Sequence, residues 1–303
     1  MEELEHAQTR LDHIRTVAPI LGALRTISLG SWRVALRQKI GVQQYEERLT
    51  AILSSLVPHL SPGRRARRSA RRARHADPSS SGQLVILVVG SERGLCGRFN
   101  AELVERAEQY LAEQEATGVQ VALMALGTRV RRILLRRERP LAWSGSLSVA
   151  ALPPYTLAID LARRWLARYE AYELDAVDLV YNAYHGAARY EPAVTRLIPP
   201  QLSFEGDAAS RDPWMAPIIE TDPLSLYARV VEQWAALSLY ELLLDSAAAE
   251  HSTRFQLMEA ASQNADRLIE ELTLVIQTAR QQAITQEMTE LAAGAGLIGR
   301  SES

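Results

Sequence analysis

The sequence has 303 residues, of which 34 are basic and 36 acidic, so its formal net charge is −2 at pH 7. Hydrophobic residues make up 47% and charged residues 23%, which excludes a chain that is disordered throughout. The single cysteine, Cys96, excludes an internal disulfide and any metal site built from several cysteines. We therefore expect a globular protein in a reducing compartment, with no overall charge that favours nucleic acid.

Membrane insertion is not expected. The longest apolar runs are LVILVVG at 84–90 and VALMALG at 121–127, well short of the roughly 20 residues that cross a bilayer. The N-terminal residues are acidic and polar, unlike a signal peptide. Any association with a membrane is therefore expected to run through partner proteins.

Residues 1–60 predict a long helix that packs along a second helix, because seven residues spaced alternately three and four apart form one stripe. The side chains become smaller along the stripe, which lets another backbone approach. Pro19 removes a helical hydrogen bond to the carbonyl of Arg15 at a cost of about 3 kcal/mol, so we expect a kink or a late helix start there. The stripe consists of Ile14, Val17, Leu21, Leu24, Ser28, Ser31 and Ala35.

Residues 61–83 contain seven arginines between Arg64 and Arg74, flanked by Pro, Gly and Ser. Like charges this dense favour a solvated linker. The alternative is an electrostatic contact with an acidic protein surface, anionic lipid or nucleic acid. The run lacks aromatic residues for base stacking, so nucleic-acid recognition has little support.

Strand and helix patterns alternate between residues 84 and 204. This alternation favours an α/β fold, a Rossmann-like open and largely parallel sheet with helices on its faces. The expected strands cover 84–90, 119–127, 175–186 and 193–203, and the expected helices cover 102–118, 128–139 and 154–171.

After a linker at 205–222, residues 223–295 predict a second long helix, followed by a tail at 296–303. A helix of about 70 residues is roughly 100 Å long, too long to fit inside a domain of this size. We expect an antiparallel coiled coil of the two terminal helices, locally unwound near Gln281 where the spacing changes. The alternative is two separate helices packed on the middle domain. The second stripe consists of Met258, Ala261, Ala265, Leu268, Leu272, Val275 and Ala279.

The stretch SERGLCGRFN at 91–100 follows an apolar strand, where many α/β proteins bind phosphate. A Walker loop requires Lys and Ser or Thr after its last glycine, but Arg98, Phe99 and Asn100 follow Gly97. A dinucleotide-binding glycine pattern is also absent. We therefore expect a structural turn, with Asn100 as the cap of a helix that starts near Ala101.

The sequence offers no other catalytic or metal-binding pattern. Cys96 near a helix N-terminus and Arg93 is a weak candidate nucleophile, and a buried structural cysteine is the favoured interpretation. We expect no catalytic residue, cofactor or metal, and surface or packing roles for all histidines. These are His6, His13, His59, His75, His185 and His251, none at metal-ligand spacing.

Four segments together resemble the γ subunit of F-type ATP synthases. The residues at 246–296, SAAAEHSTRFQLMEAASQNADRLIEELTLVIQTARQQAITQEMTELAAGAG, closely resemble the C-terminal signature of that family. SERGLCGRFN, DAVDLVYNAYHG and IRTVAPILGALRTISLGSWRVA resemble its body and N-terminal helix. The resemblance covers nearly the whole chain and identifies it as a divergent member, since Pro19, Gly22 and Ser31 stand where the family usually has lysine.

The resemblance implies a central rotor shaft that couples ion flow through the membrane sector to ATP synthesis or hydrolysis. The implied partners are the α and β subunits, the ε subunit and the ring of c subunits, on the cytoplasmic face of the bacterial plasma membrane. Nucleotide chemistry would take place in the partners. The alternatives are a non-motor coiled-coil adaptor derived from the family and a stand-alone α/β phosphate-binding enzyme.

The resemblance also implies which residues contact the β subunit. Positions that match polar family residues hydrogen-bonded to β-subunit loops lie near the C-terminus, and positions that face the β-subunit lever lie near the N-terminus. The C-terminal set is Arg280, Gln281, Thr285 and Glu287, and the N-terminal set is Leu24, Arg25 and Arg33.

Overall fold

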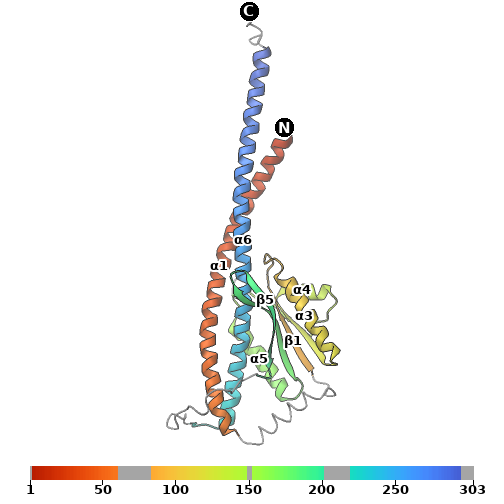
Figure 1. Cartoon of the computed structure of the whole chain (residues 1–303), viewed down its shortest axis with the longest axis vertical. Coiled ribbons are helices and arrows are strands. Elements are labelled where there is room, and N and C mark those ends of the chain that lie inside the picture. The colour runs from red at the N-terminus through yellow and green to blue at the C-terminus, as the bar shows by residue number, and fades with distance from the viewer. Residues whose placement is uncertain (1, 61–82, 149–151, 201–218, 295–303) are drawn as a thin grey trace, which may run out of the picture. The chain divides into compact units, whose positions relative to one another are not determined.

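A computed structural model describes residues 2–60, 83–148, 152–200 and 219–294. It divides into two compact units, one of residues 1–27 and 255–303 and the other of residues 28–254. Two long helices, α1 (Glu2–Leu56) and α6 (Pro223–Gly294), contribute residues to both units (Figure 1). A short 3-10 turn, η1 (Val57–His59), follows α1.

The second unit contains a five-stranded sheet in the order β3-β2-β1-β4-β5. Its strands are β1 (Gln83–Val89), β2 (Gln120–Leu126), β3 (Trp143–Gly145), β4 (Ala176–Gly186) and β5 (Arg189–Ile198). All neighbours run parallel except β4 and β5, which form an antiparallel hairpin. The predicted open, largely parallel sheet is confirmed. Strand β3 was not predicted, because three residues are too few to show a period.

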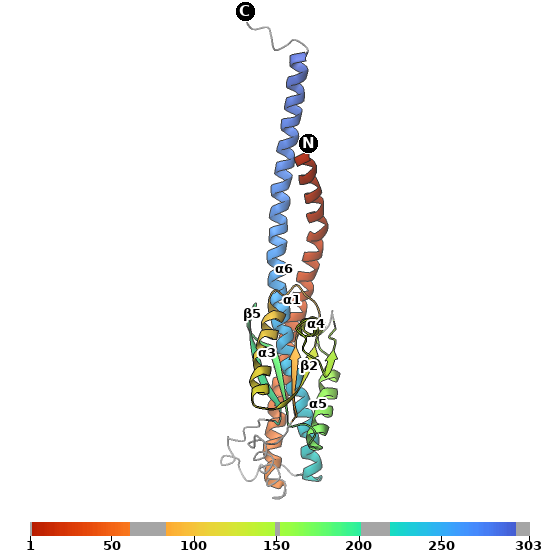
Figure 2. The same cartoon turned by 90° about the vertical axis from the view of Figure 1, so that its right-hand side faces the viewer.

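Helices cover both faces of the sheet, as Figure 2 shows. Alternate residues of β1 point to opposite sides, and nearly every one is buried, as expected for a central parallel strand. Leu84, Ile86 and Val88 pack with α3 (Phe99–Ala116) and α4 (Thr128–Arg136). Val85 and Leu87 pack with α5 (Tyr155–Glu170) and with α6. Burial of each such side chain contributes roughly 1.5–3 kcal/mol.

Within the second unit, α1 and α6 pack side by side and run antiparallel. A step forward along α1 matches an equal step backward along α6. Three cross-helix contacts show this register: Lys39 Nζ to Asp245 Oδ1 at 2.6 Å, Gln43 Nε2 to Glu241 Oε1 at 2.6 Å, and the Ser238 hydroxyl to the Glu46 carboxylate. Small residues such as Ala35 and Ala248 are fully buried there.

The first unit is also an antiparallel helix pair. Arg25 Nη1 donates to Glu259 Oε2 at 2.8 Å. Ala7 and Leu11 of α1 pack against Ile276 of α6, with Leu4, Ile269 and Leu272 beside them. The predicted antiparallel coiled coil of the terminal helices is confirmed, and the predicted stripe of α1 is confirmed at Ser28 and Ala35, which are buried in the second unit.

Two members of the predicted stripes are placed wrongly. Val17 is exposed. Val275 is 55% exposed, whereas the neighbouring Ile276 is only 6% exposed and takes its place. Both α6 positions carry branched apolar residues, so spacing cannot choose between them, and a straight helix with 3.6 residues per turn drifts from a strict 3.5-residue pattern.

Two further expectations for the long helices need correction. The predicted late helix start at Pro19 is wrong, because α1 runs through Pro19 from Glu2, with packing on either side at Leu11 and Arg25. A kink at Pro19 stays a prediction. Helix α6 continues regularly past Gln281, and in the described part of the first unit its apolar packing ends at Ile276. The position of the predicted unwinding therefore lies beyond the packed part of the pair.

Both predicted linkers lie mainly outside the described residues, as does the predicted tail. The arginines from 64 to 74 fall within residues 61–82, which the structure does not describe. The division into linkers, body and tail stays a prediction, although α6 begins at Pro223 as expected.

Candidate functional site

The turn at residues 90–98 lies at the carboxyl end of β1, between β2 and β4 in the sheet. In open α/β sheets, ligands bind at this edge, where successive connections leave in opposite directions. For this turn the sequence predicts a structural role rather than a phosphate site, and the contacts of its side chains test that prediction.

The polar side chains of the turn bond to one another. Asn100 Oδ1 accepts a hydrogen bond from the Ser91 backbone N–H at 2.9 Å, and Asn100 Nδ2 donates to Ser91 Oγ at 2.8 Å. Ser91 Oγ in turn donates to the Arg93 carbonyl at 2.7 Å. The predicted helix cap at Asn100 is wrong: α3 begins at Phe99, and the Asn100 side chain turns back to hold the end of β1.

Arg254 of α6 holds the turn from the other side. Its Nε donates to the Gly94 carbonyl and its Nη2 to the Arg93 carbonyl, both at 3.2 Å. Nη2 also pairs with Glu250 Oε1 at 2.5 Å, and both side chains are largely buried. Burial raises the pKa of Glu250, and Arg254 opposes that shift. We name this set of contacts the Arg254 clamp.

His251 completes the surroundings of Arg254. Its Nδ1 lies 3.3 Å from Arg254 Nη1. Burial lowers the pKa of His251 to about 4, and the charge of Arg254 adds to the effect. His251 is therefore neutral at physiological pH. Surface or packing roles for the histidines stay a prediction.

Cys96 does not have the properties of a nucleophile. It is buried beneath the turn, with Asn100 Nδ2 3.4 Å from its sulfur. Burial raises the pKa of its thiol, and the nearby Glu250 charge raises it further. The alternative of a reactive thiol with a lowered pKa is wrong, because desolvation outweighs the arginines.

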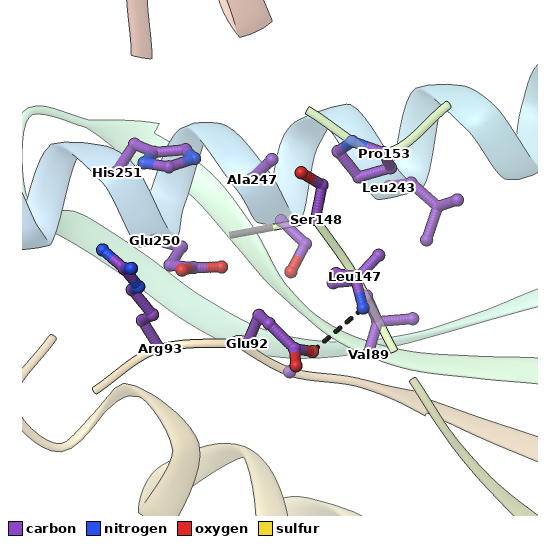
Figure 3. A pocket seen from close by; sticks show the side chains of 12 residues that line it. Val89, Glu92, Arg93, Leu147, Ser148, Pro153, Leu243, Ala247, Glu250 and His251 are labelled. Carbon is purple, nitrogen blue, oxygen red and sulfur yellow. Dashed lines mark hydrogen bonds between the residues drawn. The ribbon is translucent and has the colours of Figure 1, made fainter. Parts of the chain in front are cut away.

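A small cavity remains beside the clamp (Figure 3). Its volume is about 20 Å³, enough for about one water molecule. Leu243 and Ala247 of α6 form one wall, so this helix fills the crevice where other α/β proteins place a ligand. The cavity is too small for a nucleotide.

Glu92, which also lines the cavity, is fully engaged by protein donors. Its carboxylate accepts hydrogen bonds from the Leu147 N–H at 2.9 Å, the Thr128 N–H at 3.0 Å and the Thr128 hydroxyl. Burial raises its pKa, but these hydrogen bonds outweigh that effect and the pKa is lowered. An anionic group at this edge disfavours phosphate, which supports a structural turn.

The predicted C-terminal contact residues lie together on α6 after Ile276, where the apolar packing of the described first unit ends. We call residues 277–294 the free part of α6. Arg280, Gln281, Thr285 and Glu287 are all exposed. The Thr285 hydroxyl donates to the Gln281 carbonyl at 2.8 Å, within the helix. A shallow groove along one side of the helix is lined only by Thr and Gln: Thr278, Gln281, Gln282, Thr285, Gln286 and Thr289.

The same segment carries an apolar stripe that the sequence reasoning did not select. Ile284, Met288 and Leu291 are 57%, 66% and 73% exposed. Their i, i+4, i+7 spacing places them on one side of the helix. That spacing was a usable signal in the sequence.

The predicted N-terminal contact residues differ in their surroundings. Leu24 is half-buried in the first unit, where Arg25 pairs with Glu259. Arg33 is exposed and belongs to the second unit. Arg25 is thus already engaged within the chain, which sequence reasoning had not foreseen.

The described residues contain neither a cluster of metal-ligating side chains nor a membrane-spanning helix. In residues 2–60, 83–148, 152–200 and 219–294, no group of three or more His, Cys, Asp or Glu side chains is placed to hold a metal ion. None of the helices in these same ranges is long and apolar enough to cross a membrane.

The chain matches the family model described as ATP synthase over residues 3–296. The ATP synthase gamma chain of Trichlorobacter lovleyi is 27% identical over 98% of this chain and 99% of the relative. That of Anaeromyxobacter dehalogenans is 30% identical over 97% of this chain and 99% of the relative.

Solved structures share the fold. A chain of the Euglena gracilis mitochondrial ATP synthase, in the structure of its OSCP, F1 and c-ring, has a TM-score of 0.60 at 15% identity and covers 100% of this chain and 99% of its own. A chain of the Tetrahymena thermophila central stalk and c-ring has a TM-score of 0.54 at 17% identity over 80% and 99%. The chain therefore belongs to the ATP synthase family, among its gamma chains.

Proposed function

We propose that this chain works as the central shaft of a rotary ATP synthase, turning inside a ring of α and β subunits. Its rotation couples ion flow through the membrane sector to ATP synthesis or hydrolysis. The chain also contacts the ε subunit and the c ring, and stays peripheral on the cytoplasmic face of the plasma membrane. The match to the ATP synthase family over residues 3–296 and the similarity to gamma chains over nearly the whole chain support this assignment.

The observation that carries the proposal is the free part of α6. Apolar packing in the described part of the first unit ends at Ile276, yet α6 continues to Gly294. Ile284, Met288 and Leu291 are exposed there on one side of the helix. Contiguous exposed apolar side chains mark a protein interface, and a surrounding ring covers a helix on all sides.

The polar side chains of the same segment are the proposed contacts to β. Arg280, Gln281, Thr285 and Glu287 have side chains directed to solvent over two helical turns. They are available to hydrogen-bond loops of the ring as each β subunit passes. Because Arg280 is basic, Glu287 is acidic and the other two are neutral, different sides of the helix present different charges to the ring.

The N-terminal residues add a second proposed contact. Arg33 is exposed and Leu24 is half-buried, so the proposed direct contact uses the Arg33 side chain and the exposed part of Leu24. Arg25 is held by Glu259 at 2.8 Å. The two side chains are 41% and 34% exposed, and a solvent-accessible pair contributes only about 0–1 kcal/mol. Arg25 can therefore exchange Glu259 for a carboxylate of β at little cost.

These contacts explain how a chain without a catalytic site changes catalysis. A shaft that contacts one conformation of β more favourably than another shifts the population of conformations by that difference in free energy. Nucleotide chemistry then takes place in the partners, while this chain supplies the differential contact. At the 90–98 turn, α6 fills the crevice and leaves a cavity of about 20 Å³, which is consistent with nucleotide chemistry in the partners.

Co-expression with the cognate α and β subunits tests the proposal. We expect a complex that retains this chain through purification and whose ATP hydrolysis depends on it. A complex that forms without the chain and hydrolyses ATP equally well would contradict the shaft function. Retention of the chain with no effect on hydrolysis would favour the adaptor alternative, and micromolar nucleotide binding by the isolated chain would favour the enzyme.

A further inference from the structure

Helix α4 presents a group of arginines to solvent on the sheet face opposite α5 and α6 of the second unit (Figure 1). Its apolar side chains Val130 and Leu134 are buried against the sheet. The helix contains no acidic residue, so its outer side is cationic. We name this side the α4 arginine surface. Its exposed residues are Arg129, Arg131, Arg132, Leu135 and Arg136.

The two arginines that follow on the chain already bind carboxylates of a neighbouring helix. Arg137 pairs with Glu108 of α3, and Arg139 pairs with Glu115 of α3 at 3.8 Å. The two glutamates stand seven residues apart, so they lie on the same side of α3. On its flank toward α3, this part of the chain therefore binds an acidic helix through arginine–carboxylate pairs.

The arginines of the outer side have no such acceptor in the part of the chain that the structure describes. Arg132 and Arg136 form no ion pair and no side-chain hydrogen bond there. They stand four residues apart on the helix, and like charges at that spacing destabilise it. Carboxylates supplied by a partner would remove this repulsion and repeat the pairing that α3 provides on the other flank.

Leu135 adds an apolar contact in the middle of the α4 arginine surface. It is 53% exposed. Arg131 and Arg132 precede it by four and three residues, so they are its neighbours on the helix. An apolar side chain within a charged rim suits a protein interface, in which the rim orients the partner and the centre is buried.

The surroundings of α4 favour protein over other anionic partners. A helix that lies on a membrane turns its apolar side to the lipid, whereas the apolar side of α4 is buried against the sheet. Single-stranded nucleic acid is bound through aromatic side chains that stack on the bases, and α4 contains no aromatic residue. The remaining match is a protein surface that combines carboxylates with an apolar residue.

We propose that the α4 arginine surface docks an acidic helix of a partner protein. Arg132 and Arg136 bind its carboxylates, and Leu135 is covered by one of its apolar side chains. None of these residues belongs to the proposed contacts with β. The docking site therefore goes beyond the shaft function and does not require it.

Modification of arginine by phenylglyoxal, measured at each site by mass spectrometry on the full chain, tests the docking site. The probe is a synthetic helical peptide with glutamates around one leucine, at about 0.15 M salt to screen distant charges. We expect the peptide to slow modification of Arg132 and Arg136 and to leave Arg164, an exposed arginine of α5, unchanged. Measurement at each site separates this signal from any binding to the arginines at 64–74.

Two double variants test whether position or total charge decides the binding, measured as the peptide concentration that half-protects Arg129. Arg132→Gln with Arg136→Gln should weaken binding about tenfold, because each exposed pair contributes up to about fivefold. Arg137→Gln with Arg139→Gln is the matched control, since it removes the same charge from arginines that α3 already binds. It should weaken binding less than about threefold. Equal losses in the two variants would overturn the proposal.

Other probes test the class of partner on the wild-type chain. Vesicles of phosphatidylcholine and phosphatidylglycerol, and single-stranded DNA, should protect Arg132 and Arg136 less than the peptide does at the same salt concentration. Equal protection by either probe would overturn the choice of a protein partner. A peptide with serine in place of its leucine should protect less, and equal protection would contradict the contact at Leu135. Absence of protection by the acidic peptide would show that no docking site exists.

Discussion

The Arg254 clamp predicts a large loss of stability on substitution of Arg254. Arg254→Met removes the ion pair with Glu250 and two hydrogen bonds to the carbonyls of Arg93 and Gly94. It leaves Glu250 buried without a partner, and a buried charge left in this way costs about 3–5 kcal/mol. We expect the free energy of unfolding of the second unit to fall by that amount.

Arg267 offers a matched control, because it forms an ion pair with Glu271 at the same i, i+4 spacing on the same helix. The side chains of that pair are 69% and 60% exposed, against 7% and 12% for Arg254 and Glu250. Arg267→Met should therefore cost no more than about 0.5 kcal/mol.

Urea denaturation followed by tryptophan fluorescence measures the change at Arg254, since Trp165 and Trp234 are buried in the second unit. Loss of helical circular dichroism in urea measures the change at Arg267, which lies in the first unit. The double variant Glu250→Met, Arg254→Met removes the isolated charge and should recover about 2 kcal/mol relative to Arg254→Met alone. Equal costs for Arg254→Met and Arg267→Met, or no recovery in the double variant, would refute the clamp as a buried, charge-dependent contact.

Three further predictions follow from the helices. Alanine at both Arg280 and Gln281 should lower ATP synthesis by the assembled complex without changing the thermal unfolding of the chain, because both side chains are exposed; unchanged synthesis would count against the β contacts. In urea denaturation, Ile276→Ala should lower the free energy of unfolding by about 2–4 kcal/mol, because Ile276 is buried, and Val275→Ala by less than about 0.5 kcal/mol, because Val275 is exposed. A larger loss for Val275→Ala than for Ile276→Ala would show that Val275 is the buried residue, as the spacing predicted. Because the pKa of His251 is lowered to about 4 in the fold, its contribution to stability is present above pH 6.5 and is lost by up to about 3 kcal/mol as pH falls toward 4; His251→Gln should remove this pH dependence.

The sheet was predictable because its signals are local. Strand β1 is a continuous apolar run, and Gly118 lies just beyond the end of α3 where a helix stop was expected. Central parallel strands that are buried on both faces need such runs, so sequence alone shows them. The choice between Val275 and Ile276 was not predictable, because each satisfies a helical spacing and only the partner helix decides.

The polar contacts of the candidate site depend on tertiary structure. Glu250 and Arg254 stand four residues apart on a helix, as many exposed pairs do, and nothing in that spacing indicates burial. Their burial depends on α6 crossing the end of β1, which brings residues about 160 positions apart in the chain into contact. Asn100 was misassigned for the same reason, since its partner Ser91 lies across the turn.

The packing of α6 against the sheet leaves too little space for a nucleotide at the carboxyl end of β1. In many proteins of this architecture the carboxyl edge next to the first strand stays open, and backbone N–H groups at the following turn bind phosphate. In this chain Leu243 and Ala247 of α6 line that edge, and Arg254 binds the carbonyl groups of the turn. A guanidinium that binds carbonyls fixes the turn to the helix, and the carboxylates of Glu92 and Glu250 repel an anion. The edge that holds a ligand elsewhere therefore fixes α6 to the sheet of the second unit, together with the packing of Leu239 and Leu243 in the core.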